Sequence, residues 1–164
     1  MNRHENPFPR HRGPQQGFML IEVLCSLLIF AIGILAMVGL QAASVQQSTA
    51  ARHRAIAATQ ANDLIGRMWV SDRTAATLQA SFASGSGSTT NTGYASWYAA
   101  VQASGLPKVS AQPPTVAFTT VAGGGSSATS SSLATITIYW TAPGEAIPSG
   151  ATSAHKYVAM AQIK

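Results

Sequence analysis

The sequence predicts an α+β protein in which one long N-terminal α-helix packs on a small antiparallel β-sheet. Three observations support this prediction. Residues 18–40 are almost entirely apolar, residues 41–71 carry apolar side chains at helical spacing, and three short segments in the C-terminal third have the composition or alternation of β-strands. No proline interrupts residues 18–71, so we expect a single helix with a membrane half and an amphipathic half.

Residues 1–17 form a basic leader ahead of this helix. The leader contains Arg3, Arg10 and Arg12 against one acid, Glu5, together with several prolines. Prolines at this density prevent a packed fold, and basic residues before an apolar segment hold that end of the chain in the cytoplasm. The remainder of the chain is therefore expected on the far side of a membrane.

Residues 18–40 are long enough to cross a lipid bilayer. At 1.5 Å per residue this helix measures roughly 34 Å, compared with about 30 Å for the hydrocarbon core. Its only ionisable side chains are those of Glu22 and Cys25. A carboxylate at the centre of such a span costs on the order of 2.5–3.5 kcal/mol, so Glu22 requires a functional explanation and a partner.

Cleavage between Gly17 and Phe18 would create that partner. Phe18 would then carry a free α-ammonium four residues before Glu22. Within one chain the two charges could pair weakly, whereas in a packed array of helices the carboxylate could meet the ammonium of a neighbouring subunit. Breaking such a pair in apolar surroundings leaves a buried charge without a partner, so the pair would fix the register of assembly.

The residues from Gly17 to Leu24 resemble the class III signal of type IV prepilins and of the pseudopilins of type II secretion. The resemblance implies cleavage after Gly17 by a prepilin peptidase, N-methylation of Phe18 and a role for Glu22 in subunit docking. It also implies a type IV pilin-like fold, in which a helical spine lies on an antiparallel sheet.

Two further segments narrow the resemblance. Residues 31–41 and 61–68 look like the minor pilin family usually called PilV, the type IV pilus modification proteins; the similarity covers residues 13 to about 73 well and the remainder of the chain only loosely. This chain has Gly66 before Arg67, where that family is expected to have an acid, so the resemblance supports no charge pair between these two positions.

The resemblance implies a minor pilin that primes or supports pilus assembly and surface functions such as adhesion and twitching motility. The implied partners are the prepilin peptidase, other minor and major pilins, the inner-membrane assembly machinery and the lipid bilayer. The implied organisation is a leader (1–17), a transmembrane half-helix (18–40), an amphipathic half-helix (41–71) and a periplasmic globular region (72–164). The protein would cross the inner membrane once and enter a surface pilus after assembly.

Other interpretations remain open at this point. A type II secretion minor pseudopilin would use the same membrane segment, and a membrane-tethered ligand-binding module would use it without entering a filament. The segment could also be an ordinary secretory signal, but the apolar region of such a signal is shorter and does not normally contain a glutamate. In a plain single-span anchor, Glu22 would extend to the headgroups.

The amphipathic half carries its apolar side chains on one helical face, with arginines and polar residues on a face interpreted as solvated. Residues 71–93 are predicted to be a loop because residues 84–93 are rich in Gly, Ser and Thr. A short helix comes next, in which Tyr94, Trp97, Tyr98 and Val101 share one face. Gly105 and Pro107 end it, and we interpret the aromatic stripe as core rather than as a sugar-binding surface.

Three strands are predicted, at residues 115–121, 133–141 and 157–163. Residues 133–141 give the clearest alternation, with Ala134, Ile136, Ile138 and Trp140 on one face. A Gly- and Ser-rich connection beginning at residue 123 joins the first two strands, and a segment containing Pro143 and Pro148 joins the last two. A sheet this small must pack on another element, for which the apolar stripe of the long helix is available.

The composition offers little for other functions. Loss of the leader lowers the formal charge from +5 to +3, and the basic residues are scattered, so no nucleic-acid site is indicated. Cys25 is the single cysteine, which excludes an intrachain disulfide and suggests a small packing residue. His53 and His155 are too few to argue for a metal site, and no hydrolase, Walker or Cys-x-x-Cys motif occurs. We expect neither enzymatic activity nor a cofactor.

Overall fold

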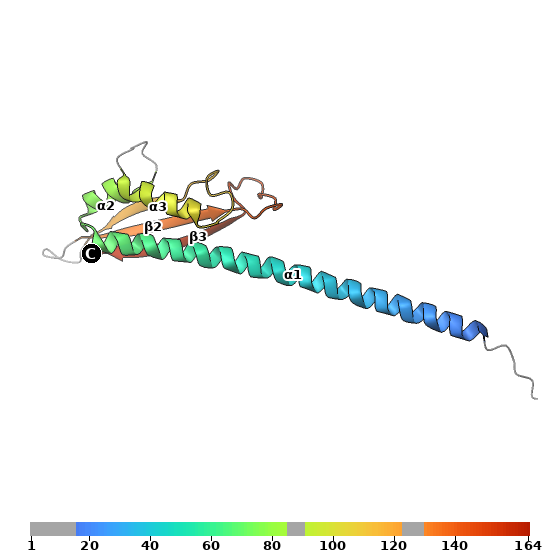
Figure 1. Cartoon of the computed structure of the whole chain (residues 1–164). Coiled ribbons are helices and arrows are strands. Elements are labelled where there is room, and N and C mark those ends of the chain that lie inside the picture. The colour runs from blue at the N-terminus through green and yellow to red at the C-terminus, as the bar shows by residue number, and fades with distance from the viewer. Residues whose placement is uncertain (1–15, 85–90, 123–129) are drawn as a thin grey trace, which may run out of the picture. The chain divides into compact units, whose positions relative to one another are not determined.

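A computed structural model of the chain describes residues 16–84, 91–122 and 130–164 (Figure 1). The elements in order are α1 (Gln16–Val70), α2 (Ala75–Phe82), α3 (Thr92–Ala103), β1 (Thr115–Val121), β2 (Ser131–Trp140) and β3 (His155–Ile163). The predicted α+β class is confirmed. The chain divides into two compact units, Met1–Ser48 and Thr49–Lys164, which we describe separately. Residues 1–15 of the predicted leader lie outside the described residues.

The described part of the first unit is the N-terminal portion of α1. The helix is unbroken from Gln16, two residues before the predicted start of the span. Side chains from Phe18 to Ser48 are exposed throughout. Helical hydrogen bonds satisfy the backbone there, while the apolar side chains remain exposed.

The second unit is built on a three-stranded sheet with the order β1-β2-β3. Both pairs are antiparallel, with Val116 opposite Ile136 and Ile136 opposite Ala159. On the central strand β2, the predicted alternation is confirmed, because Ala134, Ile136 and Ile138 are fully buried while the residues between them are half-buried. One face of the sheet therefore belongs to the core.

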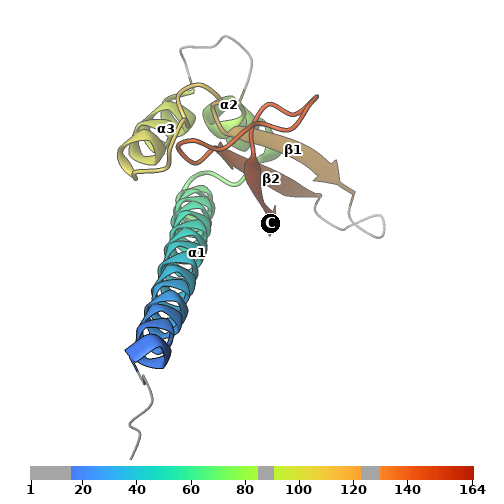
Figure 2. The ribbon, with the colours of Figure 1, turned by 90° about the vertical axis from the view of Figure 1, so that its right-hand side faces the viewer.

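Helices cover that face. The end of α1, from residue 49 onward, contributes to the same core as α2, α3 and the strands, and in Figure 2 α3 lies to the left of the strands. The buried apolar residues that form this core include Ala57, Ala61, Leu64, Met68, Leu78, Phe82, Trp97, Val101, Val116, Ala134, Ile136, Ile138, Trp140 and Ile163. The predicted packing of the amphipathic half-helix on the sheet is thereby confirmed.

The predicted short helix corresponds to α3. Trp97 and Val101 are fully buried, and Tyr94 and Tyr98 are half-buried against the core. The indole nitrogen of Trp97 donates a 2.9 Å hydrogen bond to the backbone carbonyl of Gln60, which joins α3 to α1. Gly105 adopts φ 83° just beyond the helix, a conformation that favours glycine. The aromatic stripe is therefore mainly core, as predicted.

The prediction of a loop throughout residues 71–93 is wrong, because α2 occupies Ala75–Phe82. Leu78 and Phe82 lie one turn apart on α2 and are both buried. Two large apolar residues among alanines and polar residues give a weak periodic signal, and tertiary packing makes this helix stable. Residues 85–90 of the predicted loop lie outside the described residues.

The ends of that segment are fixed to the core. The Asn91 side-chain amide donates a 2.6 Å hydrogen bond to the Ala83 carbonyl. The Ser84 backbone N–H donates to the Val116 carbonyl at 3.0 Å, and the Val116 N–H donates to Ser84 Oγ at 2.7 Å. The backbone N–H and C=O of Val116 therefore bond to Ser84 and point away from β2.

The strand limits differ slightly from those predicted. β2 begins at Ser131 and β3 at His155, each two residues before its predicted start, and β2 ends one residue earlier than predicted. The Gly- and Ser-rich connection between β1 and β2 falls on residues 123–129, which lie outside the described residues.

Candidate functional site

The predicted processing and docking residues lie at the beginning of α1. The helix starts at Gln16, so Gly17 and Phe18 are in its first turn and Glu22 is one turn further along. Phe18 is 85% exposed, and Glu22 is exposed as well. After cleavage, the free α-amine of Phe18 would lie at the N-terminal end of the helix, about one turn before Glu22.

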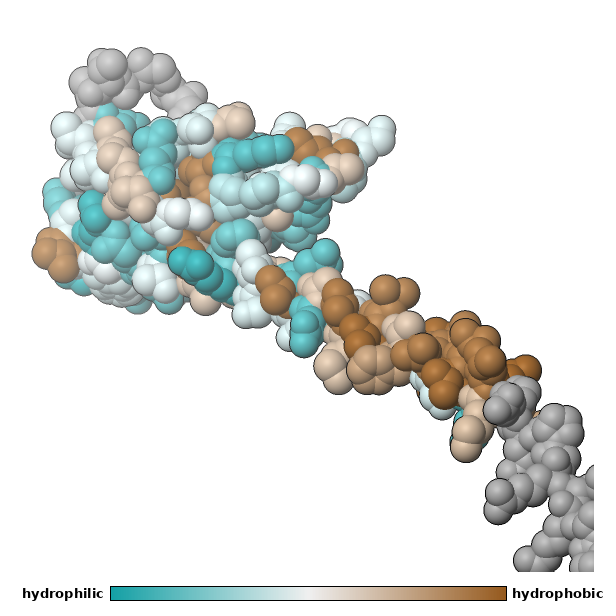
Figure 3. Space-filling view, turned by 45° about the vertical axis from the view of Figure 1, so that its right-hand side comes forward, coloured by the Kyte–Doolittle hydropathy of each residue, from teal (hydrophilic) through white to brown (hydrophobic). Residues whose placement is uncertain are grey.

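Around Glu22 the helix surface is apolar on all sides. We call residues 18–45 of α1 the apolar belt, which Figure 3 shows as a run of brown side chains. Its exposed large apolar residues are Phe18, Met19, Leu20, Ile21, Val23, Leu24, Leu27, Leu28, Ile29, Phe30, Ile32, Ile34, Leu35, Met37, Val38, Leu40 and Val45.

An exposed apolar surface of this extent is stable only against lipid or other protein chains. None of its most apolar stretch is buried, and α1 is long and apolar enough to cross a membrane. Length and composition of this kind are also typical of signal sequences. The apolar belt therefore combines a membrane-compatible surface with one carboxylate, and Cys25 is an exposed free thiol on it.

Arg67, near the C-terminal end of α1, makes two polar side-chain contacts. Its guanidinium lies 2.9 Å from the Asp63 carboxylate, one turn earlier, and donates a 3.3 Å hydrogen bond to Ser96 on α3. Gly66 leaves open space beside these residues. The charge partner of Arg67 is therefore Asp63 rather than the residue immediately before it. Exposed pairs of this kind contribute little to stability, and the contact with Ser96 links α1 to α3.

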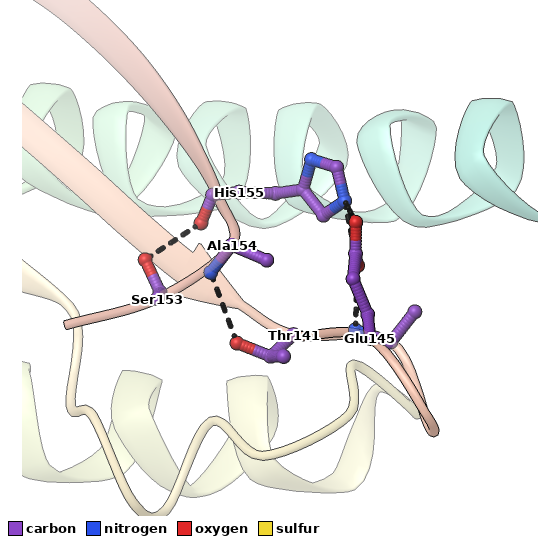
Figure 4. A network of polar contacts seen from close by, with 6 residues as sticks. Thr141, Glu145, Ser153, Ala154 and His155 are labelled. Atoms are coloured by element: carbon purple, nitrogen blue, oxygen red, sulfur yellow. Dashed lines mark hydrogen bonds and ion pairs between the residues drawn. The ribbon is translucent and has the colours of Figure 1, made fainter. Parts of the chain in front are cut away.

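A second polar cluster closes the connection between β2 and β3 (Figure 4). Both carboxylate oxygens of Glu145 lie 2.9 Å from His155 Nε2. The His155 ring stacks on Trp140 with 5.6 Å between centroids. The Ala154 N–H donates to Thr141 Oγ1 at 3.1 Å, and Ser153 Oγ donates to the His155 carbonyl. These contacts tie the two ends of the connection together.

This cluster was not predicted from the sequence, because Glu145 and His155 are ten residues apart in a segment without periodicity. Its geometry does not suit nucleophilic catalysis: the Ser153 hydroxyl bonds to a backbone carbonyl, while His155 Nε2 faces a carboxylate. Within the described ranges, no three His, Cys, Asp or Glu side chains lie close enough together to hold a metal ion.

Folding changes the titration of Tyr94 on α3. Burial, followed by the neighbouring Tyr98, raises the pKa of the Tyr94 phenol to about 12. The phenol donates a 2.7 Å hydrogen bond to the Pro114 carbonyl. This arrangement fixes α3 to the segment before β1 and keeps Tyr94 neutral, as suits a structural role.

Comparisons with family models, with curated proteins and with solved structures find no match to this chain. The class of protein is accordingly defined by the fold and by the apolar belt. A long, apolar N-terminal helix whose second half packs on a small antiparallel sheet is a pilin-like architecture, consistent with a membrane-anchored protein.

Proposed function

We propose that this protein is a minor pilin of a type IV pilus, of the PilV kind suggested by residues 31–41 and 61–68. The observation that carries the proposal is the single carboxylate of Glu22 in an otherwise apolar and fully exposed stretch of helix. A protein that merely needed an anchor would avoid this cost. A subunit that must take a fixed register among similar helices gains a directional contact from it.

The proposed cycle begins with removal of residues 1–17 by a prepilin peptidase and methylation of the new Phe18 amine. Before assembly, the apolar belt lies in the inner membrane and the second unit lies in the periplasm. On assembly, the Glu22 carboxylate accepts hydrogen bonds from the N-terminal ammonium of an adjacent pilin, and the belt exchanges lipid for neighbouring helices. The protein acts through binding alone and catalyses no reaction.

Mass measurement of the N-terminus of the mature protein tests processing. The expected product begins at a methylated Phe18. An intact leader would overturn the proposal because Glu22 would lack the new amine, and a start near Ala43 would overturn it because the mature protein would lack Glu22 itself. Gly17→Ala is expected to slow cleavage, whereas a large residue at position 17 should block it.

Substitution of Glu22 tests docking separately from membrane insertion. Glu22→Ala is expected to insert normally but to be recovered poorly in sheared pili. Glu22→Asp is the matched control, since it keeps a carboxylate and should retain part of the incorporation. Equal incorporation of Glu22→Ala and the wild-type protein would exclude the docking role.

Two further measurements separate the alternative functions. Deletion of the gene should reduce surface pili, whereas loss of secreted enzyme activity with normal pili would favour a type II secretion pseudopilin. Crosslinkers placed at residues 20–35 should capture other pilin-like helices. Their failure to do so would favour a tethered binding module.

A further inference from the structure

The outer edge of β3 is the feature from which we infer an additional interaction site. The sheet order is β1-β2-β3, so among the residues that the structure describes β3 pairs with a strand on one side only. The inference does not rest on the proposed pilus function, because it concerns only the second unit.

The hydrogen-bonding direction of each strand can be deduced from Val116. Because the backbone N–H and C=O of Val116 both bond to Ser84, they point away from β2. In an antiparallel pair these directions alternate along the strand, so Ile136, opposite Val116, directs its backbone groups toward β3. Ala159, opposite Ile136, then directs its own groups back toward β2.

The outward groups on β3 consequently belong to Lys156, Val158, Met160 and Gln162. Among the described residues, none of these four makes a backbone hydrogen bond on the outer side. Their side chains are exposed, Val158 by 42% and Met160 by 67%. The edge thus presents alternating N–H and C=O groups beside two apolar side chains.

Several β3 residues whose backbone groups face β2 are also partly exposed, which supports an open edge. On the central strand β2, Ile136 and Ile138 are fully buried, whereas their β3 partners Ala159 and Tyr157 are only half-buried. Both of these partners lie on the edge strand. An added strand would cover these residues as well as the backbone groups.

Proteins commonly protect edge strands by proline, a bulge, short length or an inward-pointing charge. β3 runs from His155 to Ile163 with continuous pairing to β2 and contains no proline. Lys156, at its beginning, carries the one charge of the strand's outward-facing residues. Lys156 lies at the beginning of this edge, and Arg73 donates a 3.0 Å hydrogen bond to the Lys164 carbonyl just beyond its end. The long, regular edge between these contacts is suited to receive an extended peptide.

We propose that the outer edge of β3 binds an extended segment of a partner protein by strand addition. The segment would carry apolar side chains at alternate positions, to lie beside Val158 and Met160, and an acidic residue facing Lys156. Main-chain hydrogen bonds would supply affinity, while the apolar contacts and the acid would supply specificity.

Hydrogen exchange on the full chain in detergent micelles tests this site with defined probes. The probes are two synthetic peptides of about eight residues with alternating valine and threonine. One peptide carries an aspartate at its N-terminal end, and the other carries it at its C-terminal end. Binding of either peptide should slow exchange of the Lys156, Val158, Met160 and Gln162 amides by at least about tenfold, equivalent to about 1.4 kcal/mol. The inward amides of β3 should change little.

Matched controls isolate each part of the interaction. A peptide with lysine replacing aspartate, and one with alternate N-methylated amides, should both fail to slow exchange. Met160→Pro removes one outward N–H without breaking the ladder to β2 and should abolish binding, whereas Met160→Leu should retain it. The N-methylated peptide keeps the test valid if Met160→Pro does not fold.

Three results would overturn the proposal. The first is unchanged exchange at saturating concentrations of both aspartate peptides. The second is equal slowing by the lysine or N-methylated peptide, which would indicate nonspecific association. The third is slowing that depends on protein concentration without any peptide, which would assign the edge to a second copy of this chain.

Discussion

The indole Nε1 of Trp97 lies 2.9 Å from the backbone carbonyl oxygen of Gln60 and donates a hydrogen bond to it. This contact joins α3 to the part of α1 that belongs to the second unit. Trp97 is fully buried and Gln60 is half-buried, so the bond lies at the border of the core. The globular region of the proposed pilin is therefore held to its helical spine by both apolar packing and a directional contact.

Trp97→Phe should destabilise the second unit by about 1–3 kcal/mol, because it removes the hydrogen bond and leaves a cavity. Trp69→Phe is the control: Trp69 is 46% exposed and should change stability by less than about 1 kcal/mol, including its contact with Arg73. Denaturant unfolding of the full chain in micelles measures both. Similar losses for the two variants would contradict the importance of the Trp97 contact.

Gly93→Ala should destabilise the protein by about 1–3 kcal/mol. A Cβ at position 93 would stand 2.5 Å from Cε1 of the Phe82 ring, and that ring is buried and cannot move freely. The matched variant Gly66→Ala lies in the interior of α1 with nothing within 4 Å, so it should stabilise by about 0.5–1 kcal/mol. Opposite signs in the same unfolding assay are expected, and two changes of the same sign would be inconsistent with this packing.

Alkaline pH should weaken the fold through Tyr94. Its pKa is raised to about 12, above the ordinary value of 10.0, so the unfolded chain loses this proton first. The contribution is fully present below pH 10 and is lost as the pH rises toward 12. Because the side chain is only half-buried, we expect a loss of about 1–2 kcal/mol.

Comparison with Tyr94→Phe between pH 8 and 11.5 isolates this effect. The variant lacks the hydrogen bond to Pro114 and should be less stable than the wild type at pH 8. The difference should shrink as the pH rises above 10. A difference independent of pH would show that Tyr94 does not carry the dependence.

Glu145→Gln should loosen the connection between β2 and β3 without unfolding the domain. Both partners of the Glu145–His155 pair are more than a third exposed, so global stability should fall by less than about 1 kcal/mol. Cleavage of residues 142–154 by a protease specific for small residues should become several-fold faster, because the tether is weaker. Asp63→Asn alters a similar exposed pair on α1 and should leave that cleavage rate unchanged.

Elements with strong periodicity could be predicted from the sequence. The limits of α1 fall within two residues of the expected 18–71, since a long apolar run without proline has few alternatives. Alternation on β2 identified Ile136 and Ile138 as core because a strand in a sheet with one buried face repeats every two residues.

Features that depend on tertiary contacts could not be predicted. α2 contributes two apolar side chains, and Phe82 is accommodated because position 93, eleven residues later, has no side chain. The pairing of Glu145 with His155 depends on how the β2–β3 connection folds back. The position of β3 at the edge of the sheet could not be predicted either, because the composition of a strand does not determine the order of strands in a sheet. The sequence alone identifies Glu22 as the one carboxylate of the apolar segment, and the structure places it on an exposed helical surface.

The hydrogen bond from Asn91 to Ala83 and the two bonds between Ser84 and Val116 have a practical consequence. Both ends of the intervening segment are anchored independently of its sequence, and the entropy of closing a loop rises only slowly with its length. Residues 85–90 can therefore be exchanged as a cassette. An epitope inserted there would label the protein in living cells while the core continues to fold as before.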